Sequence, residues 1–185
     1  MSTAITNWMS WEGGVDLVAA TAPSLSMPNV IIHLARVVHT PVGSAASGMV
    51  LYQPDPAGAP LVMGFVSTDA TVGAYFGPKI FAGTPFEAAP VLSAQIQIEV
   101  GPTYVAATVN VGGHELKTRL DGLSAFGLVN REPGGMTPFT QQGIEAVASS
   151  AQLWVDGQAV PVFVPPIGIS GGPAAVYAPA GIYAR

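Results

Sequence analysis

Lys79 is the residue of this sequence whose neighbours most suggest chemistry. It lies in the segment "AYFGPKIFAG", residues 74–83, close to Phe76, Ile80 and Phe81 and with no second charge in the segment. A surface lysine normally has polar neighbours, whereas an amine held among apolar side chains is desolvated and its ammonium form is disfavoured. Two interpretations stay open from the residues alone: a solvated turn residue beside Gly-Pro, or a desolvated amine that faces a cavity.

Arg36 and the histidines around it form a second group of candidate residues. Arg36 occurs within the apolar segment "IIHLARVV". Its guanidinium is either an anion-binding group that faces a cavity or a strand arginine that faces solvent. In a regular strand, His33 and His39 lie on the opposite face from Arg36, and we interpret both as structural. Three histidines without close spacing and no cysteine give no metal-ligand pattern, so we predict no metal and no cofactor.

Short apolar segments separated by glycine and proline dominate the chain, which has 22 glycines and 17 prolines. This pattern favours strands and turns over helices. The predicted strands are residues 30–38, 48–53, 61–67, 91–100, 103–111, 114–120, 122–130, 151–156 and 159–164, with a last strand in "AVYAPAGIYAR". Tight turns between antiparallel neighbours are predicted at Gly101-Pro102, Gly112-Gly113 and Asp156-Gly157.

Helical patterns are confined to two short segments. Residues 69–75 and 140–150 are predicted to be helical, the latter because Ile144, Val147 and Ala148 fall roughly on one helical face. No repeat or linker divides the chain, so residues 1–185 are expected to form one domain. Many short strands in one apolar domain favour a mainly β fold. We predict an antiparallel β-barrel with one or two short helices, whose interior can enclose one small ligand.

The composition limits the partners of the protein. Charged residues make up 9% of the chain and hydrophobic residues 49%, and the six Lys and Arg form no run against a net charge of −5. We therefore expect neither nucleic acid nor a membrane as a partner. The N-terminal sequence lacks a basic segment followed by an apolar one, and we expect a cytoplasmic protein. So apolar a composition also predicts a homo-oligomer, which light scattering would detect as a mass above that of one chain.

Three segments, taken in order, resemble the acetoacetate decarboxylase superfamily. "LARVVHTPVG" from residue 34 to 43 is followed by "STDATVGAYFGPK" from residue 67 to 79, and then by "VLSAQIQIEVGPTYVAATVNVGGHELKTRL". These segments are similar to the family's strand with a Pro-Val-Gly turn, to its Asp-Ala-containing helix that leads to Pro-Lys, and to the strands that follow. The resemblance extends from about residue 30 to 125.

The resemblance implies a lyase in which Lys79 forms a Schiff base with the keto group of a small keto acid. An unperturbed lysine has a pKa of about 10.4, so such an enzyme must lower this pKa to keep a free amine. Burial in an apolar pocket or a nearby cation would do so. Met63, Phe76 and Phe81 would then form the apolar wall, and Arg36 would bind the substrate carboxylate.

Two positions depart from the family's pattern. Ile80 occupies the place of a second lysine, and Ser47 lies nearest to the place of a glutamate at the mouth of the site. Two functions therefore remain open. One is an acetoacetate decarboxylase-like lyase that forms a Schiff base with a small keto acid. The other is a non-catalytic or shape-directed β-barrel that binds an apolar metabolite or templates a cyclisation.

Overall fold

The fold consists almost entirely of β-strands. The structure, a computed structural model, describes residues 5–134 and 137–185. Its strands are β1 (Trp8–Ala19), β2 (Val30–Thr40), β3 (Gly43–Tyr52), β4 (Val62–Ser67), β5 (Val91–Val100), β6 (Tyr104–Val111), β7 (His114–Asp121), β8 (Gly127–Arg131), β9 (Thr140–Val147), β10 (Ser150–Val155), β11 (Gln158–Val160) and β12 (Ala175–Ala184). Its helical elements are α1 (Ala70–Tyr75) and the π-helical turn η1 (Phe76–Ile80).

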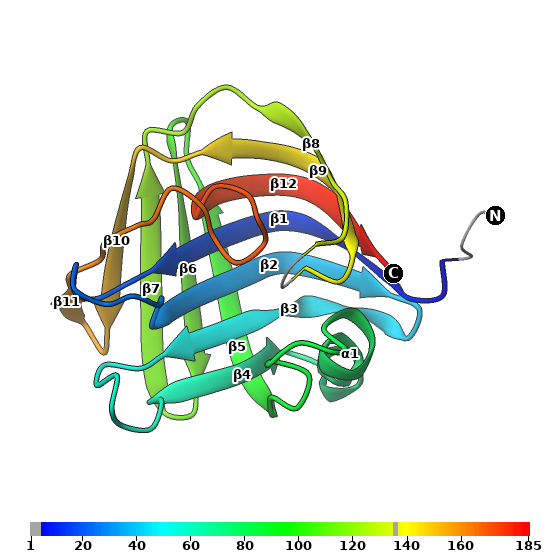
Figure 1. Ribbon diagram of the computed structural model, residues 1–185, viewed down its shortest axis with the longest axis horizontal. Helices are drawn as coiled ribbons and strands as arrows, with labels where there is room; N and C mark the ends of the chain where they lie inside the picture. Colours follow the sequence, from blue (N-terminus) through cyan, green and yellow to red (C-terminus); the bar gives the residue numbers. More distant parts are fainter. Residues whose placement is uncertain (1–4, 135–136) are drawn as a thin grey trace.

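All the strands belong to one sheet, in the order β11-β10-β7-β6-β5-β4-β3-β2-β1-β12-β9-β8. β4 and β5 pair in parallel, in a short ladder from Phe65↔Val91 to Ser67↔Ser93. At this ladder the sheet changes direction. In Figure 1, β5, β6, β7 and β10 cross behind a front layer made by β1 to β4, β8, β9 and β12. The domain therefore has two layers that are continuous through one short parallel ladder.

The main core lies between the two layers and takes alternate residues from each strand. In β2, Val30, Ile32 and Leu34 belong to it, and in β7 Leu116 and Leu120 belong to the same cluster. These side chains are between 0 and 3% exposed. Because a strand presents successive side chains to opposite faces, the intervening residues of the front layer point to its outer face.

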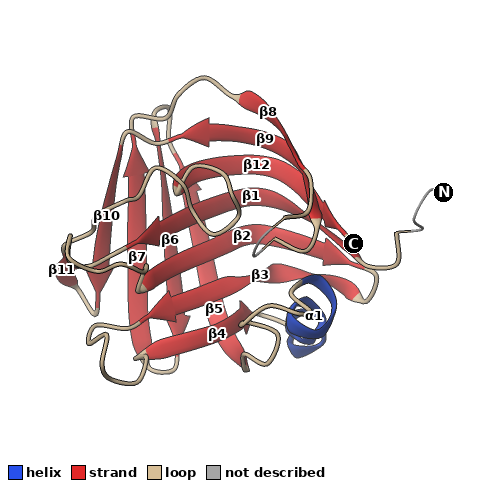
Figure 2. Ribbon diagram, viewed as in Figure 1, coloured by secondary structure: helices blue, strands red, loops and turns tan. Residues whose placement is uncertain are grey.

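A second apolar cluster covers the outer face of the front layer. Ile31 and Ala35 of β2 pack there with Phe76 and Ile80 of η1 and with Phe139. Figure 2 shows α1 and η1 lying beside β3 at one end of this face. The front layer is therefore apolar on both faces, and the space above its outer face is where side chains of η1 and of neighbouring loops meet the sheet.

The hairpins predicted from the sequence are confirmed. Gly112-Gly113 joins β6 to β7, Asp156-Gly157 joins β10 to β11, and the Gly-Pro turn joins β5 to β6. The φ angles are 60° and 84° at Gly112 and Gly113, and 50° and 76° at Asp156 and Gly157. Two successive positive φ angles are typical of the type I′ turn, whose twist matches that of the flanking strands.

The first of the two predicted helices is confirmed as α1. Asp69 precedes it, and its carboxylate accepts hydrogen bonds from the backbone N–H groups of Thr71 and Val72 at 2.8 and 3.0 Å. Such an N-cap satisfies donors that the first helical turn leaves without partners. Within the described residues, no helix is long and apolar enough to cross a membrane.

The second predicted helix, residues 140–150, is wrong. This segment forms β9 and the start of β10. The apolar stripe that suggested a helix is largely exposed, since Ile144 is 37% and Val147 41% exposed. The side chains of β9 that are buried include Gln141 and Glu145 instead. A strand that buries polar residues has no apolar alternation by which to recognise it.

The mainly β class is confirmed, but the closed barrel is not. β11 and β8 are the two ends of the strand order, and no ladder joins them in the described part of the chain. β1 was also missing from the predicted strands, although it lies between β2 and β12 near the middle of the front layer. Its segment "EGGVD" interrupts the apolar alternation, and Gly13 within it has a φ of 63°.

Candidate ligand-binding site

Two adjoining cavities lie beside the outer face of the front layer. Their volumes are about 70 and about 60 Å³. Met9, His33, Gly48, Phe76 and Tyr183 line both, so the two spaces share one wall. An engineered apolar cavity of roughly 150 Å³ takes up a benzene ring. The two cavities together therefore suit a small molecule of about that size.

The two cavities differ in the chemistry of their walls. The polar side chains that line the first cavity are Asp16, His33, Ser47, Gln141, Glu145 and Tyr183. The phenylalanines that line the second cavity are Phe65, Phe76, Phe81, Phe86 and Phe139. The combined space is therefore mainly apolar and aromatic, and Asp16, His33, Gln141, Glu145 and Tyr183 gather at one end, which we call the polar end.

Aromatic rings in contact connect the two ends. The centroid distances along this series are 4.7 Å for Trp11–Tyr183, 4.1 Å for Tyr183–Phe139, 5.6 Å for Phe139–Phe81, 5.5 Å for Phe81–Phe65 and 5.8 Å for Phe65–Phe76. Most are at the separations that aromatic pairs favour. These contacts join the rings into one continuous aromatic wall.

Gly181 makes room for the indole of Trp11 at the polar end. The two residues face each other across β1 and β12. A Cβ atom at position 181 would lie 2.1 Å from the indole ring, so any larger residue there would displace the indole. The indole Nε1 donates a hydrogen bond to the carbonyl oxygen of Ala178 at 3.2 Å. Trp11 is thus fixed by a glycine and a backbone acceptor of the neighbouring strand.

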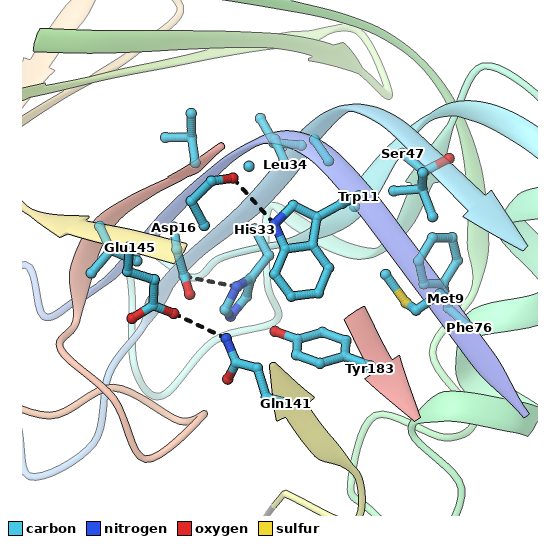
Figure 3. A pocket seen from close by; sticks show the side chains of 17 residues that line it. Met9, Trp11, Asp16, His33, Leu34, Ser47, Phe76, Gln141, Glu145 and Tyr183 are labelled. Carbon is cyan, nitrogen blue, oxygen red and sulfur yellow. Dashed lines mark hydrogen bonds and ion pairs between the residues drawn. The ribbon is translucent and has the colours of Figure 1, made fainter. Parts of the chain in front are cut away.

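A carboxylate and an imidazole meet at the polar end (Figure 3). Asp16 of β1 pairs with His33 of β2 in the sheet register, and Asp16 Oδ1 is 2.7 Å from His33 Nδ1. The side chains are 16% and 20% exposed, respectively. The geometry of this contact does not meet that of a hydrogen bond. Asp16 Oδ1 is therefore buried without a hydrogen-bond partner among the described residues. It is an electrostatic pair at hydrogen-bond distance.

Two side chains, Arg131 and Gln141, donate hydrogen bonds to Glu145 of β9. Arg131 Nη1 and Nη2 donate to its two oxygens at 2.8 and 2.7 Å, and Gln141 Nε2 donates at 3.0 Å. Glu145 is 8% exposed. The hydrogen bonds to Glu145 raise the pKa of Arg131, so the guanidinium stays charged. This bidentate pair neutralises the buried carboxylate and attaches edge strand β8 to β9.

Tyr183 supplies a hydroxyl group that is free to donate. Burial raises the pKa of Tyr183 far above its usual value, and the nearby carboxylates of Asp16 and Glu145 raise it further. In Figure 3 the hydroxyl points toward the space between His33 and Gln141. The residues that the structure describes provide it with no hydrogen-bond partner. At neutral pH the cavity therefore contains a protonated phenol able to bind an acceptor.

The raised pKa of Tyr183 predicts a loss of stability at high pH. The unfolded chain releases this proton above about pH 10, whereas the folded protein retains it. The contribution of the protonated Tyr183 side chain to the free energy of unfolding is therefore complete below pH ~10. It is lost progressively as the pH rises beyond this value. We expect Tyr183→Phe to lose less stability than the original protein between about pH 8 and about pH 11 in urea unfolding. Equal losses in the two proteins would contradict a neutral buried phenol.

Two of the residues predicted from the sequence line the cavities. Phe76 lines both, and Phe81 lines the second. Met63 is half-buried in β4 and lines neither. Lys79 lies on η1, where its residue is exposed, and it also lines neither cavity. The structure thus brings the two aromatic residues together and places Lys79 on the solvent side of its turn.

Arg36 and His39 lie on the same side of β2, so the expectation that they face opposite ways is wrong. Arg36 Nη2 and His39 Nε2 each lie 3.3 Å from the carboxylate of Glu12. The register with β3 shifts between Ala35 and Val38, and such a bulge reverses the alternation of side chains beyond it. Arg36 is exposed, with 63% of its side-chain surface accessible, and is paired outside the cavities.

The residues at the polar end were missed from the sequence, although one signal was present. Asp16 is the only Asp, Glu, Lys or Arg between Gly13 and Ala35, and it is flanked by apolar residues. Such an isolated charge is expected to have a partner or a function. Gln141 and Glu145 gave no comparable signal, because their segment was interpreted as a helix.

Comparisons with known proteins assign no family to this chain. No protein-family model matches the sequence, and the search of curated proteins found no match. Among solved structures, the crystal structure of acetoacetate decarboxylase from Legionella pneumophila is similar, with 10% sequence identity and a TM-score of 0.36. The match covers 98% of this chain and 85% of that chain. A superposition of this quality does not transfer that protein's activity to this one.

Proposed function

We propose that the protein binds a small, uncharged, largely apolar molecule in the two adjoining cavities, with its polar group beside Tyr183 and His33. The observation that carries this proposal is the lining: aromatic side chains enclose most of the space, and polar side chains gather at one end. Sites for small molecules typically combine mainly apolar walls with a few polar groups that fix the orientation of the ligand.

The charges around the cavities favour an uncharged ligand. The described residues that line them include two carboxylates, Asp16 and Glu145, and no lysine or arginine. The nearby guanidinium of Arg131 already pairs with Glu145 through both oxygens. A bound carboxylate would meet like charges without an available cation, which is costly in a space of low polarity. Neutral ketones and alcohols meet no such penalty.

The Schiff-base-forming lyase remains the alternative function. Lys79 is exposed and outside the cavities, whereas imine formation near neutral pH requires an amine in a desolvated site. Arg36, the candidate partner of a substrate carboxylate, lies beside Glu12 instead. Borohydride reduction in the presence of pyruvate or acetoacetate, followed by intact mass measurement, tests this alternative. A stable adduct on Lys79 would favour the lyase over our proposal.

The proposal is tested by adding neutral ketones and keto acids to the protein and measuring unfolding in urea. We expect cyclohexanone and acetophenone to stabilise the folded protein, by about 1.4 kcal/mol when the free ketone is at about ten times its Kd. Pyruvate and acetoacetate at the same concentrations should have no effect. Stabilisation by the keto acids alone would contradict the proposed charge selectivity.

Two variants show whether the ketone occupies the cavities. Ala35 is 6% exposed and lines the first cavity, so Ala35→Leu places additional atoms in the space that the ligand needs. This variant should remain folded and lose the stabilisation by ketones. Lys79→Ala changes an exposed side chain outside the cavities and should retain it. Loss of ketone binding in Lys79→Ala would place the ligand elsewhere.

A further inference from the structure

Polar atoms without partners converge at the polar end of the first cavity. Among the described residues, Asp16 Oδ1 is a buried side-chain atom without a hydrogen-bond partner, and the Tyr183 hydroxyl and the His33 ring line the same cavity beside it. Leaving one buried polar atom without a partner costs about 1–3 kcal/mol. Folded proteins keep few such atoms, and those that persist call for an explanation, which includes a catalytic role.

The arrangement of His33 gives it a defined direction for accepting a proton. Its Nδ1 lies 2.7 Å from Asp16 Oδ1, and the negative charge of the carboxylate favours the tautomer that carries a proton on Nδ1. The lone pair of the ring is then on Nε2, for which the described residues provide no hydrogen bond. Because Asp16 and His33 are paired in the β1–β2 register, the sheet itself holds the two groups together.

The Tyr183 hydroxyl approaches the same space from the neighbouring strand. Tyr183 pairs with Met9 across β12 and β1, and its ring is fixed between Trp11 and Phe139 at centroid distances of 4.7 and 4.1 Å. In Figure 3 the Tyr183 hydroxyl and the His33 ring lie close to each other at the polar end. A hydrogen-bond donor and a proton acceptor thus line the same cavity.

We propose that this end of the cavity is a catalytic site that moves a proton from the carbon beside the carbonyl group of a neutral ketone, which makes the protein a ketone isomerase that works through an enolate. This inference rests on the proposed function, since the ketone must first occupy the cavities. Tyr183 and His33 are the catalytic residues, and Asp16 is a positioning residue that acts through His33.

The proton transfer is balanced without any further reactant. His33 Nε2 takes the proton from the α-carbon, and the electron pair of the C–H bond becomes part of the new C=C bond. The electron pair of the C=O bond moves to the oxygen, where the Tyr183 hydroxyl donates a hydrogen bond to the developing negative charge. The imidazolium then returns a proton, to the same carbon or, in an unsaturated ketone, to a carbon further along the chain.

The reaction is measured by hydrogen exchange in deuterated water. Cyclohexanone or acetophenone is incubated with the protein, and proton NMR follows the loss of the α-hydrogen signal. We expect exchange that exceeds the rate in buffer and saturates with ketone concentration. His33→Gln should lower the saturated rate at least about 100-fold, the usual size of a general-base contribution. Tyr183→Phe removes the donor with little change in shape and should also lower it about 100-fold.

Two further variants separate catalysis from a structural effect. His39→Gln makes the same substitution in a histidine that lies beside Glu12 outside the cavities, and it should exchange at the original rate. Asp16→Asn should lower the exchange rate at saturating ketone and leave the ketone concentration for half-saturation unchanged. A change in the saturated rate alone is expected of a residue that orients the base. A general loss of structure would alter both the saturated rate and the ketone concentration for half-saturation.

Ketone binding is measured separately by urea unfolding, so that the two proposals fail in different ways. A ketone that stabilises the protein but exchanges no faster than in buffer overturns the isomerase and leaves the binding function standing. A ketone that neither stabilises the protein nor exchanges overturns both. Exchange that is equally fast in His33→Gln, Tyr183→Phe and the original protein places the reaction outside this site and overturns the assignment of these residues.

Discussion

Arg131→Leu is expected to lower the free energy of unfolding by about 3 kcal/mol, because it leaves a buried carboxylate without its cation. Glu145 is 8% exposed and accepts hydrogen bonds from both Nη atoms of Arg131. A charge removed from water and then left unpaired costs more than the pair itself contributes. Urea unfolding measures the loss, which should be larger than that caused by replacing any other arginine of the protein.

A matched control and a second change test the cause of this loss. Arg119 pairs with Asp121 with side chains 38% and 32% exposed, so water screens this pair and Arg119→Leu should cost less stability than Arg131→Leu. Adding Glu145→Gln to Arg131→Leu removes the unpaired charge and should recover part of the stability. If the double variant is less stable than Arg131→Leu alone, burial of an unpaired carboxylate is not the cause.

Phe65→Ala is expected to lower the free energy of unfolding by about 3–5 kcal/mol and to enlarge the second cavity. Phe65 is 1% exposed, and its ring contacts those of Phe76 and Phe81 at centroid distances of 5.8 and 5.5 Å. Removing the ring leaves a space that rigid aromatic neighbours cannot fill. The variant, where it remains folded, should bind a larger ketone such as propiophenone more tightly than the original protein does.

Phe126 provides the comparison for this substitution. It is 56% exposed, and its centroid lies 6.1 Å from that of Tyr177, away from the cavities. Phe126→Ala should cost no more than about 1 kcal/mol, since little apolar surface is buried there. It should also leave the preference among ketones unchanged. A similar cost for both substitutions would show that the series of aromatic rings does not contribute more than ordinary surface contact.

The parts of the fold that depend on short-range signals could be predicted from the sequence. β5 is predicted with its observed bounds, and β6 and β7 differ from prediction by one residue at one end, because Gly-Gly and Gly-Pro turns mark where these strands stop. β1 and β9 could not be recognised in this way. β1 contains Gly13 in a left-handed conformation, and β9 buries polar side chains, so neither shows the alternation that identifies a strand.

The site was harder to predict than the strands because its residues are distant in the chain. Asp16 and His33 meet through one strand pair, but Tyr183 joins them only because β12 pairs with β1. Phe76 and Phe81 were identified from their place beside Lys79, and they do line the cavities. The lysine itself lies on the other side of η1. A periodicity argument cannot determine which face of a five-residue turn meets the sheet.

The pairing of β1 with β12 constrains the order in which this protein can fold during synthesis. The ladder runs from Trp8↔Ala184 to Leu17↔Ala175, so a strand made early must wait for one made more than 150 residues later. Until β12 leaves the ribosome, β1 has an unpaired edge, and the polar end of the cavity lacks Tyr183. Contacts this distant in sequence slow folding, and open strand edges promote association between chains. Nascent chains halted before β12 should therefore depend on chaperones, while β5 to β7, with their short turns, can already form their hairpins.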